Sequence, residues 1–103
     1  MDSQLKRGLL VMCILKLLEE ERYGYDLIKI MQNYFPGTDE STLYGILRRL
    51  NQDSYTELFH RDVTHGAKRK YYKLSPRGKE ALDKYISSWK EINFILNDIG
   101  ITG

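Results

Sequence analysis

The spacing of the apolar side chains changes twice along this chain, and each change restricts the possible fold. Up to about residue 52, apolar residues recur every three or four positions, as in Leu10, Ile14 and Leu17, which is the period of an amphipathic helix. Over residues 55 to 74 the period falls to two, the spacing of β-strands. From residue 76 the helical period returns. The sequence therefore predicts a mainly α-helical fold with one small β-hairpin.

Residues 4 to 21 are expected to form a helix that is apolar nearly all round. Its core stripe follows the spacing i, i+3, i+4, i+7, i+8 and consists of Leu10, Cys13, Ile14, Leu17 and Leu18. A second face carries Leu5, Leu9 and Met12, and a third carries Val11 and Leu15. A helix of this kind must bury more than one side, so we expect it to contact its own core and a second chain.

Two further helices are expected, over residues 23 to 35 and 40 to 52. Pro36 ends the first, because the residue before a proline disfavours helical geometry. The inward faces of the two helices carry Tyr23, Leu27, Ile30, Met31 and Tyr34, and Leu43, Ile46, Leu47 and Leu50, respectively. The other sides of the second helix present Ser41, Thr42, Tyr44, Gly45, Arg48 and Arg49.

Residues 55 to 61 and 69 to 74 are predicted to be two strands of a hairpin, joined by a loop that contains Gly66. Successive side chains of a strand point to opposite faces. We therefore expect Tyr72 and Leu74 to face inward, and the residues of the other parity to face outward, namely Arg69, Tyr71 and Lys73.

The last helix is predicted over residues 76 to 98, because Ser75-Pro76 combines a cap with a proline in the first turn. Its apolar residues follow the alternating spacing of three and four that forms a coiled-coil seam. A terminal seam in so short a chain has little of its own fold to pack on, so we expect it to pair with the first helix and with a second copy. The predicted dimer interface consists of Leu5, Leu9, Met12, Leu82, Tyr85, Trp89, Ile92, Leu96 and Ile99.

Positive charge is concentrated in one segment of the chain. Of the sixteen Lys and Arg residues, seven lie between residues 61 and 79 with one acid, so this segment is +6 while the whole chain is +2 and the remainder −4. A localised positive field can steer a phosphate backbone to one face. The alternative is that the run of cations is ordinary solvated surface.

Catalytic and membrane functions have little support in the sequence. His60 and His65 lie in the hairpin without metal-ligand spacing, and Cys13 has no evident base nearby. The longest apolar run, from Leu9 to Leu15, is too short to cross a bilayer, and no secretory signal precedes it. We expect a cytoplasmic protein that is not an enzyme and holds no cofactor or metal.

The order of these elements is that of a winged helix-turn-helix. Residues 1 to 75 would form the DNA-binding domain, with the helix at 40 to 52 in a major groove and the hairpin on the adjacent backbone. Residues 76 to 103 would form a dimerisation helix that presents two such units to half-sites about 34 Å apart. The predicted DNA-binding residues are Ser41, Thr42, Tyr44, Arg48, Lys68, Arg69 and Lys70. The alternative is a winged helix that uses the same surface on another protein.

The residues that suggest this fold also carry a family resemblance. The stretches YGYDL at 23–27, STLYGILRRL at 41–50, GAKRKYYKLS at 66–75 and GKEAL at 78–82 resemble the PadR family of transcriptional regulators over residues 9 to 99. Two departures stand out: Ser54 occupies the place of a helix-ending glycine, and Ala67 replaces a second glycine before the basic run. The resemblance implies a repressor that an aromatic compound releases from its operator. The paired half-sites predicted above make a pseudo-palindromic operator, bound by a homodimer, the natural target.

The length of the chain is similar to that of the short branch of this family, which has one C-terminal helix. In multidrug-responsive members of that branch, a tryptophan from each subunit stacks on a flat ligand at a hollow dimer interface. The resemblance implies this role for Trp89, with Ile86, Asn93, Val11 and Leu15 as further walls. The alternative is that Trp89 only packs the interface.

Overall fold

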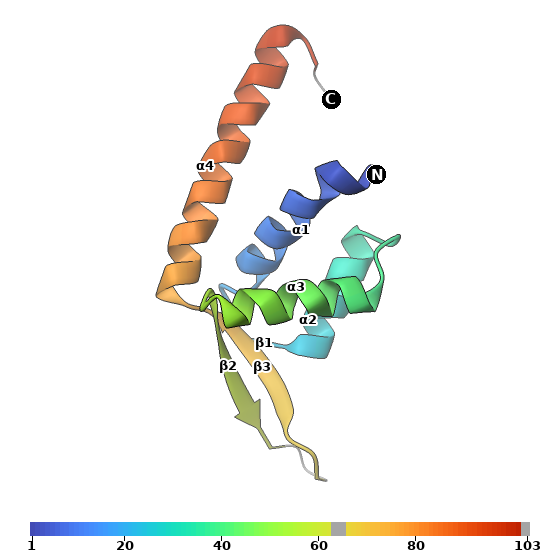
Figure 1. Ribbon diagram of the computed structural model, residues 1–103, viewed down its shortest axis with the longest axis vertical. Coiled ribbons are helices and arrows are strands. Elements are labelled where there is room, and N and C mark those ends of the chain that lie inside the picture. The colour runs from blue at the N-terminus through green and yellow to red at the C-terminus, as the bar shows by residue number, and fades with distance from the viewer. Residues whose placement is uncertain (63–65, 102–103) are drawn as a thin grey trace.

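The computed structural model of the chain describes residues 1–62 and 66–101. Its elements are, in order, α1 (Ser3–Leu17), β1 (Arg22–Tyr23), α2 (Gly24–Tyr34), α3 (Glu40–Gln52), β2 (Thr56–Arg61), β3 (Arg69–Leu74) and α4 (Pro76–Ile99). The molecule is elongated, 56 × 30 × 19 Å, with the hairpin of β2 and β3 at one end and the tip of α4 at the other (Figure 1). This arrangement confirms the mainly helical fold with a small sheet that the sequence predicts.

Helix α1 ends four residues earlier than the predicted residue 21, because other parts of the fold take its last carbonyl groups. The Arg22 side chain donates a hydrogen bond of 2.7 Å from Nε to the carbonyl oxygen of Leu17. The backbone N–H of Leu74, at the end of β3, donates one of 2.7 Å to the carbonyl oxygen of Leu18. These contacts satisfy the groups that a helix end leaves open and turn the chain towards the sheet.

The sheet has three strands instead of the two predicted, in the antiparallel order β1-β3-β2. The additional strand, β1, is two residues long and is too short to show a periodicity. It pairs Tyr23 with Tyr71, and their ring centroids lie 5.6 Å apart. Tyr71, predicted to face solvent, is therefore half-buried under Tyr23.

The core lies where α1, α2 and α3 meet the base of α4. It consists of Leu10, Ile14, Leu15, Leu18, Leu27, Ile28, Met31, Leu43, Leu47, Leu50 and Leu82. The predicted inward face of α2 needs a correction: Ile28 is fully buried, whereas Tyr34 is 73% exposed. Helix α2 is thus rotated about its axis from the predicted orientation, because it packs against α1 and α3 on two sides.

Helix α4 begins on the sheet and then leaves the rest of the subunit (Figure 1). Ser75 caps it, with its Oγ accepting a hydrogen bond of 3.0 Å from the N–H of Gly78. Leu82 is buried in the core, but beyond Ile86 nearly every residue of the helix is exposed. The helix ends at Gly100, whose φ of 106° lies in the left-handed region suited to glycine. Among the described residues, no helix combines the length and apolar character required to cross a bilayer.

Candidate nucleic-acid interface

Helix α3 lies across the subunit with one face in the core and the opposite face in solvent. It begins after Asp39, whose carbonyl oxygen accepts a hydrogen bond of 3.2 Å from the N–H of Leu43. The buried leucines at positions 43, 47 and 50 determine which way the helix is rotated. Ser41 and Arg48 are consequently exposed on the outer side, where a polyanion could reach them.

Tyr44 occupies an intermediate position on α3. Its side chain is half-buried and packs against the core. Burial, and secondarily the negative charge of Glu40, raise the pKa of its phenol. Tyr44 is therefore a neutral hydrogen-bonding group held in a defined place, which suits a group that contacts one base or phosphate.

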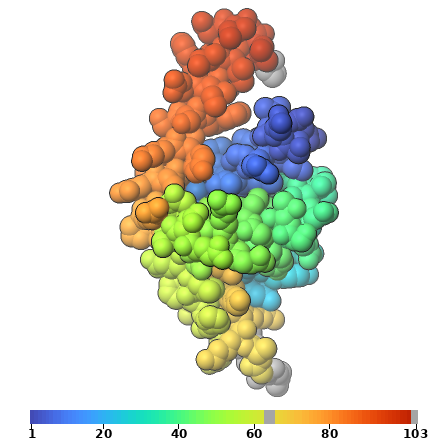
Figure 2. Space-filling model, viewed as in Figure 1, coloured from blue at the N-terminus to red at the C-terminus, as the bar shows by residue number. Residues whose placement is uncertain are grey.

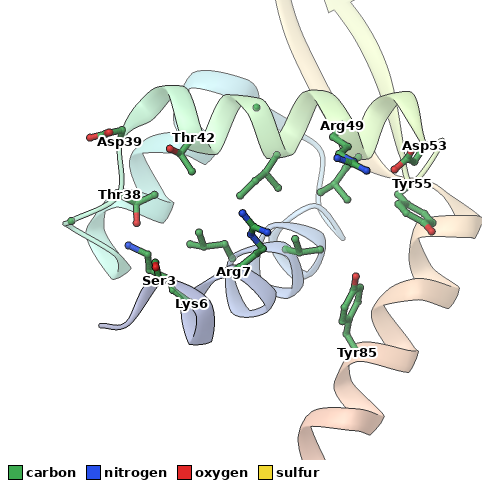
Figure 3. A pocket seen from close by; sticks show the side chains of 16 residues that line it. Ser3, Lys6, Arg7, Thr38, Asp39, Thr42, Arg49, Asp53, Tyr55 and Tyr85 are labelled. Carbon is green, nitrogen blue, oxygen red and sulfur yellow. The ribbon is translucent and has the colours of Figure 1, made fainter.

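Thr42 and Arg49 lie on a different side of α3 from Ser41 and Arg48. They line a groove of about 920 Å³ between α3, α1 and the start of α4. Figure 3 shows Arg7 of α1 and Arg49 of α3 directed into this groove, with Tyr85 of α4 at one end. The structure therefore separates Thr42 from the other predicted DNA-binding residues of α3. The sequence does not predict this groove, because residues from three helices and from the segments that flank α3 form it.

The predicted cations of the hairpin, Lys68, Arg69 and Lys70, are all exposed. Hereafter the wing is the hairpin of β2 and β3 with its connection, of which residues 63–65 lie outside the described part of the chain. The Arg69 guanidinium lies over the Tyr23 ring, 4.7 Å from its centroid. Such cation–π contacts restrain an arginine without neutralising it. Arg69 thus keeps its charge at a fixed place over the Tyr23 ring.

Ion pairs neutralise two of the seven cations between residues 61 and 79. Arg61 donates hydrogen bonds of 2.8 and 2.6 Å to the two carboxylate oxygens of Glu21. Lys79 lies 3.0 Å from Glu19 and 3.3 Å from Asp83. Within residues 1–62 and 66–101, the remaining five have no carboxylate within ion-pair distance: Lys68, Arg69, Lys70, Lys73 and Arg77. The positive charge of the wing is therefore smaller than the number of cations in the sequence suggests, but the wing remains positively charged.

The Glu21 carboxylate is a feature of the site that the sequence does not predict. The hydrogen bonds from Arg61, and secondarily the charges of Arg61 and Lys73, lower its pKa. Glu21 and Arg61 are forty residues apart in the chain, and no sequence pattern connects them.

The predicted dimer surface is mostly available on this subunit. Trp89 is 43% exposed and Ile99 69% exposed. Other exposed or half-buried members are Leu5, Leu9, Met12, Tyr85, Ile92 and Leu96. Leu82 needs a correction, since it is fully buried in its own subunit's core and has no surface to offer a second copy.

Of the residues predicted to surround a ligand, some lie at the surface of the subunit and one lies in its core. Asn93 is exposed beside the surface of Trp89 on α4, and Ile86 and Val11 are half-buried. Leu15 is fully buried in the subunit's core, because α1 turns this face towards α2 and α3. Leu15 therefore cannot line a ligand site at the surface. Among the residues that the structure describes, no group of His, Cys, Asp and Glu side chains is arranged to hold a metal ion.

Comparisons by sequence and by structure both find PadR-like transcriptional regulators. Residues 14–84 match the transcriptional regulator PadR-like family. An uncharacterised protein of Lysinibacillus sphaericus is 35% identical over 99 residues, covering 92% of this chain and 91% of that protein.

Solved structures resemble the whole subunit. A PadR-like transcriptional regulator of Bacillus cereus has a TM-score of 0.84 at 30% identity, covering 98% of this chain and 100% of that chain. A PadR-like transcription factor of Bacteroides fragilis has a TM-score of 0.80 at 37% identity, covering 95% and 96%. These likenesses confirm the predicted winged-helix fold.

Proposed function

Because the chain belongs to the PadR-like family of transcriptional regulators, we propose that it is a homodimeric repressor that binds a pseudo-palindromic operator. Members of this family are DNA-binding regulators and not enzymes. In the proposal, residues 1–75 read the DNA and residues 76–103 join the two subunits. The protein acts in the cytoplasm, where its operator is located.

One observation carries the proposed DNA contact: cations without carboxylate partners lie on the wing beside the exposed side of α3. Figure 2 shows α3 crossing the middle of the molecule, with the hairpin extending below it on the same view. Ser41 and Arg48 contact the major groove from α3, while Lys68 and Lys70 contact the backbone from the wing. Phosphate contacts position such a protein and base contacts supply its specificity.

The exposed apolar surface of α4 supports the proposed dimer. Soluble monomers rarely leave large apolar side chains in a continuous surface, yet Tyr85, Trp89, Ile92 and Ile99 are all exposed along one helix. A second copy related by a twofold axis would cover them. Twofold symmetry of the protein accounts for the palindromic operator.

Salt dependence tests whether the partner is DNA. The measurement is fluorescence anisotropy with the DNA upstream of the protein's own gene, over a range of salt concentrations. If about six phosphates are neutralised, the slope of log K against log salt is near −5, at about 0.9 per phosphate. A flat response contradicts DNA binding and favours a winged helix that binds another protein.

The roles of α3 and the wing can be separated by substitution. Lys68→Ala with Lys70→Ala is expected to weaken binding to that fragment and to random-sequence DNA alike, since phosphate contacts carry no sequence information. Arg48→Ala is expected to weaken the specific complex more, by about 1–3 kcal/mol if it contacts a base edge. Lys84→Ala, on exposed α4, is the matched control for lost charge. Equal losses on both DNAs for Arg48→Ala contradict a reading role for α3.

A flat aromatic ligand between the two copies of Trp89 is the proposed effector that releases the repressor from DNA. Trp89 is the single tryptophan of the chain, so its emission reports on this position alone. Planar aromatic compounds are expected to quench it, and Trp89→Ala is expected to abolish release from DNA by the same compounds. Sedimentation shows whether that variant remains a dimer. A panel of such compounds without any quenching contradicts the ligand site.

A further inference from the structure

The outward face of the sheet carries a continuous set of contacts between the wing and the helical body. The Arg61 guanidinium lies 5.8 Å from the centroid of Phe59 and 5.7 Å from that of Tyr71. It ends on the Glu21 carboxylate, to which it donates two hydrogen bonds. Arg61 is the last residue of β2, and Glu21 directly precedes β1. This ion pair therefore connects the outer part of the wing to the body of the subunit.

Two aromatic rings, those of Tyr71 and Tyr23, form a second contact between the wing and β1. Tyr71 lies between Arg61 and Tyr23, with the Tyr23 ring centroid 5.6 Å away. Arg69, which pairs with Arg61 across the hairpin, lies over the Tyr23 ring. Both arginines at the outer end of the described strands thus lean back towards β1 and the loop before it.

The wing needs such a connection because few strand pairs fix its orientation relative to the helical body of the subunit. Strand β1 pairs with β3 only at Arg22 with Tyr72 and Tyr23 with Tyr71. Outward of Tyr71, the wing contains only β2 and β3, and a two-stranded hairpin is marginally stable by itself. The cations Lys68 and Lys70 lie in that part, so their position relative to α3 depends on whatever holds the hairpin.

We propose that Glu21 is a positioning residue for DNA binding: through Arg61 it holds the wing at the angle at which Lys68 and Lys70 reach the phosphate backbone. The inference rests on the proposed contact between the wing and DNA. Glu21 itself touches no DNA, and it acts through the guanidinium of Arg61 and the rings beneath it.

Removing the charge of Glu21 distinguishes a positioning role from simple electrostatics, because the two predict opposite changes in DNA affinity. Glu21→Gln removes a negative charge near the wing and releases the charge of Arg61, which by itself would strengthen attachment to a polyanion. If Glu21 positions the wing, the same substitution weakens attachment. The two effects cannot be mistaken for each other.

The test compares Glu21→Gln with Glu20→Gln by anisotropy, on the DNA upstream of the protein's own gene. Glu20 is a matched control, because its side chain is 82% exposed. Glu20→Gln changes one ion pair, in which the Glu20 carboxylate lies 3.6 Å from the guanidinium of Arg22. Glu21→Gln is expected to weaken binding about three- to tenfold, in the lower part of the range for residues coupled in one network, while Glu20→Gln leaves it unchanged or strengthens it. Unchanged or stronger binding of Glu21→Gln would overturn the inference.

Two further measurements identify the route of the effect. In a protein that already carries Lys68→Ala and Lys70→Ala, Glu21→Gln is expected to have no further effect, whereas a general loss of structure would still lower affinity. The exchanged pair, Glu21→Arg with Arg61→Glu, is expected to recover affinity relative to either single change. Additive losses or a failed recovery would overturn the positioning role.

The same variants distinguish failure of the inference from failure of the proposed function. If the two lysine substitutions weaken binding and Glu21→Gln does not, only the positioning role falls. If the lysine substitutions themselves have no effect, the wing contact falls and this inference falls with it.

Discussion

Gly78 is the residue at which one added methyl group is expected to do most damage to this fold. A Cβ atom at this position would lie 2.0 Å from the carbonyl oxygen of Tyr55 and 2.7 Å from Cδ1 of Leu74. The Leu74 side chain can move, but the Tyr55 carbonyl cannot, because it accepts a hydrogen bond of 3.1 Å from the N–H of Ser75. Gly78→Ala must therefore push the start of α4 away from the sheet.

The size of the loss follows from what this displacement breaks. Forcing extra volume into a packed site costs about 1–3 kcal/mol. The cap of α4 is also disturbed, since Ser75 Oγ accepts from Gly78 and donates 2.7 Å to the carbonyl oxygen of Ser54, and losing a cap costs about 1 kcal/mol. Alanine returns about 1 kcal/mol through its higher helix propensity. The net expectation is a loss of about 1–3 kcal/mol, a sizeable part of the stability of a small domain.

Urea denaturation followed by circular dichroism measures this loss, at one fixed protein concentration because dimerisation contributes to stability. Gly45→Ala is the matched control: it lies within α3, and a Cβ there meets no atom within 4 Å. That variant is expected to gain up to about 1 kcal/mol. If Gly78→Ala proved as stable as Gly45→Ala, the close approach of α4 to Tyr55 would be refuted.

Two further predictions concern stability. Ser54, at φ 66°, adopts the left-handed region that disfavours side chains, so Ser54→Gly is expected to raise the free energy of unfolding by about 0.5–1 kcal/mol in the same urea assay; a loss would contradict this. Hydrogen bonds from Lys16 and Arg61 lower the pKa values of Glu19 and Glu21, respectively. Their stabilisation is therefore full above a pH of about 4.3 and is lost as pH falls through the lowered values; replacing both with Gln should flatten that acid dependence.

Much of the fold could be predicted because it depends on local patterns. Helix α3 begins and ends where the sequence predicts, since buried leucines three or four residues apart specify one face. The limits of β2 and β3 agree with the prediction to within one residue. The Ser75-Pro76 pair specifies the start of α4 through its own backbone preferences. Ser54, predicted to replace a helix-ending glycine, does adopt a positive φ.

Other features depend on which elements meet, and periodicity cannot show that. Strand β1 forms only because β3 offers it a partner, and α1 ends early because Leu74 takes the carbonyl of Leu18. The sequence places Leu82 in the seam of the last helix and Leu15 on a third face of the first helix, yet both are fully buried in the core of their own subunit.

By itself, then, the sequence determined the order and type of the elements, the site of the basic wing and an apolar C-terminal helix, because these follow from the spacing of residues along one chain. Only the tertiary structure decided which cations remain without a partner. Arg61 and Glu21 are forty positions apart and meet only when β2 and β1 share a sheet. Charge counted along a chain therefore overstates the field of a folded surface, since distances between side chains in space decide which charges neutralise each other.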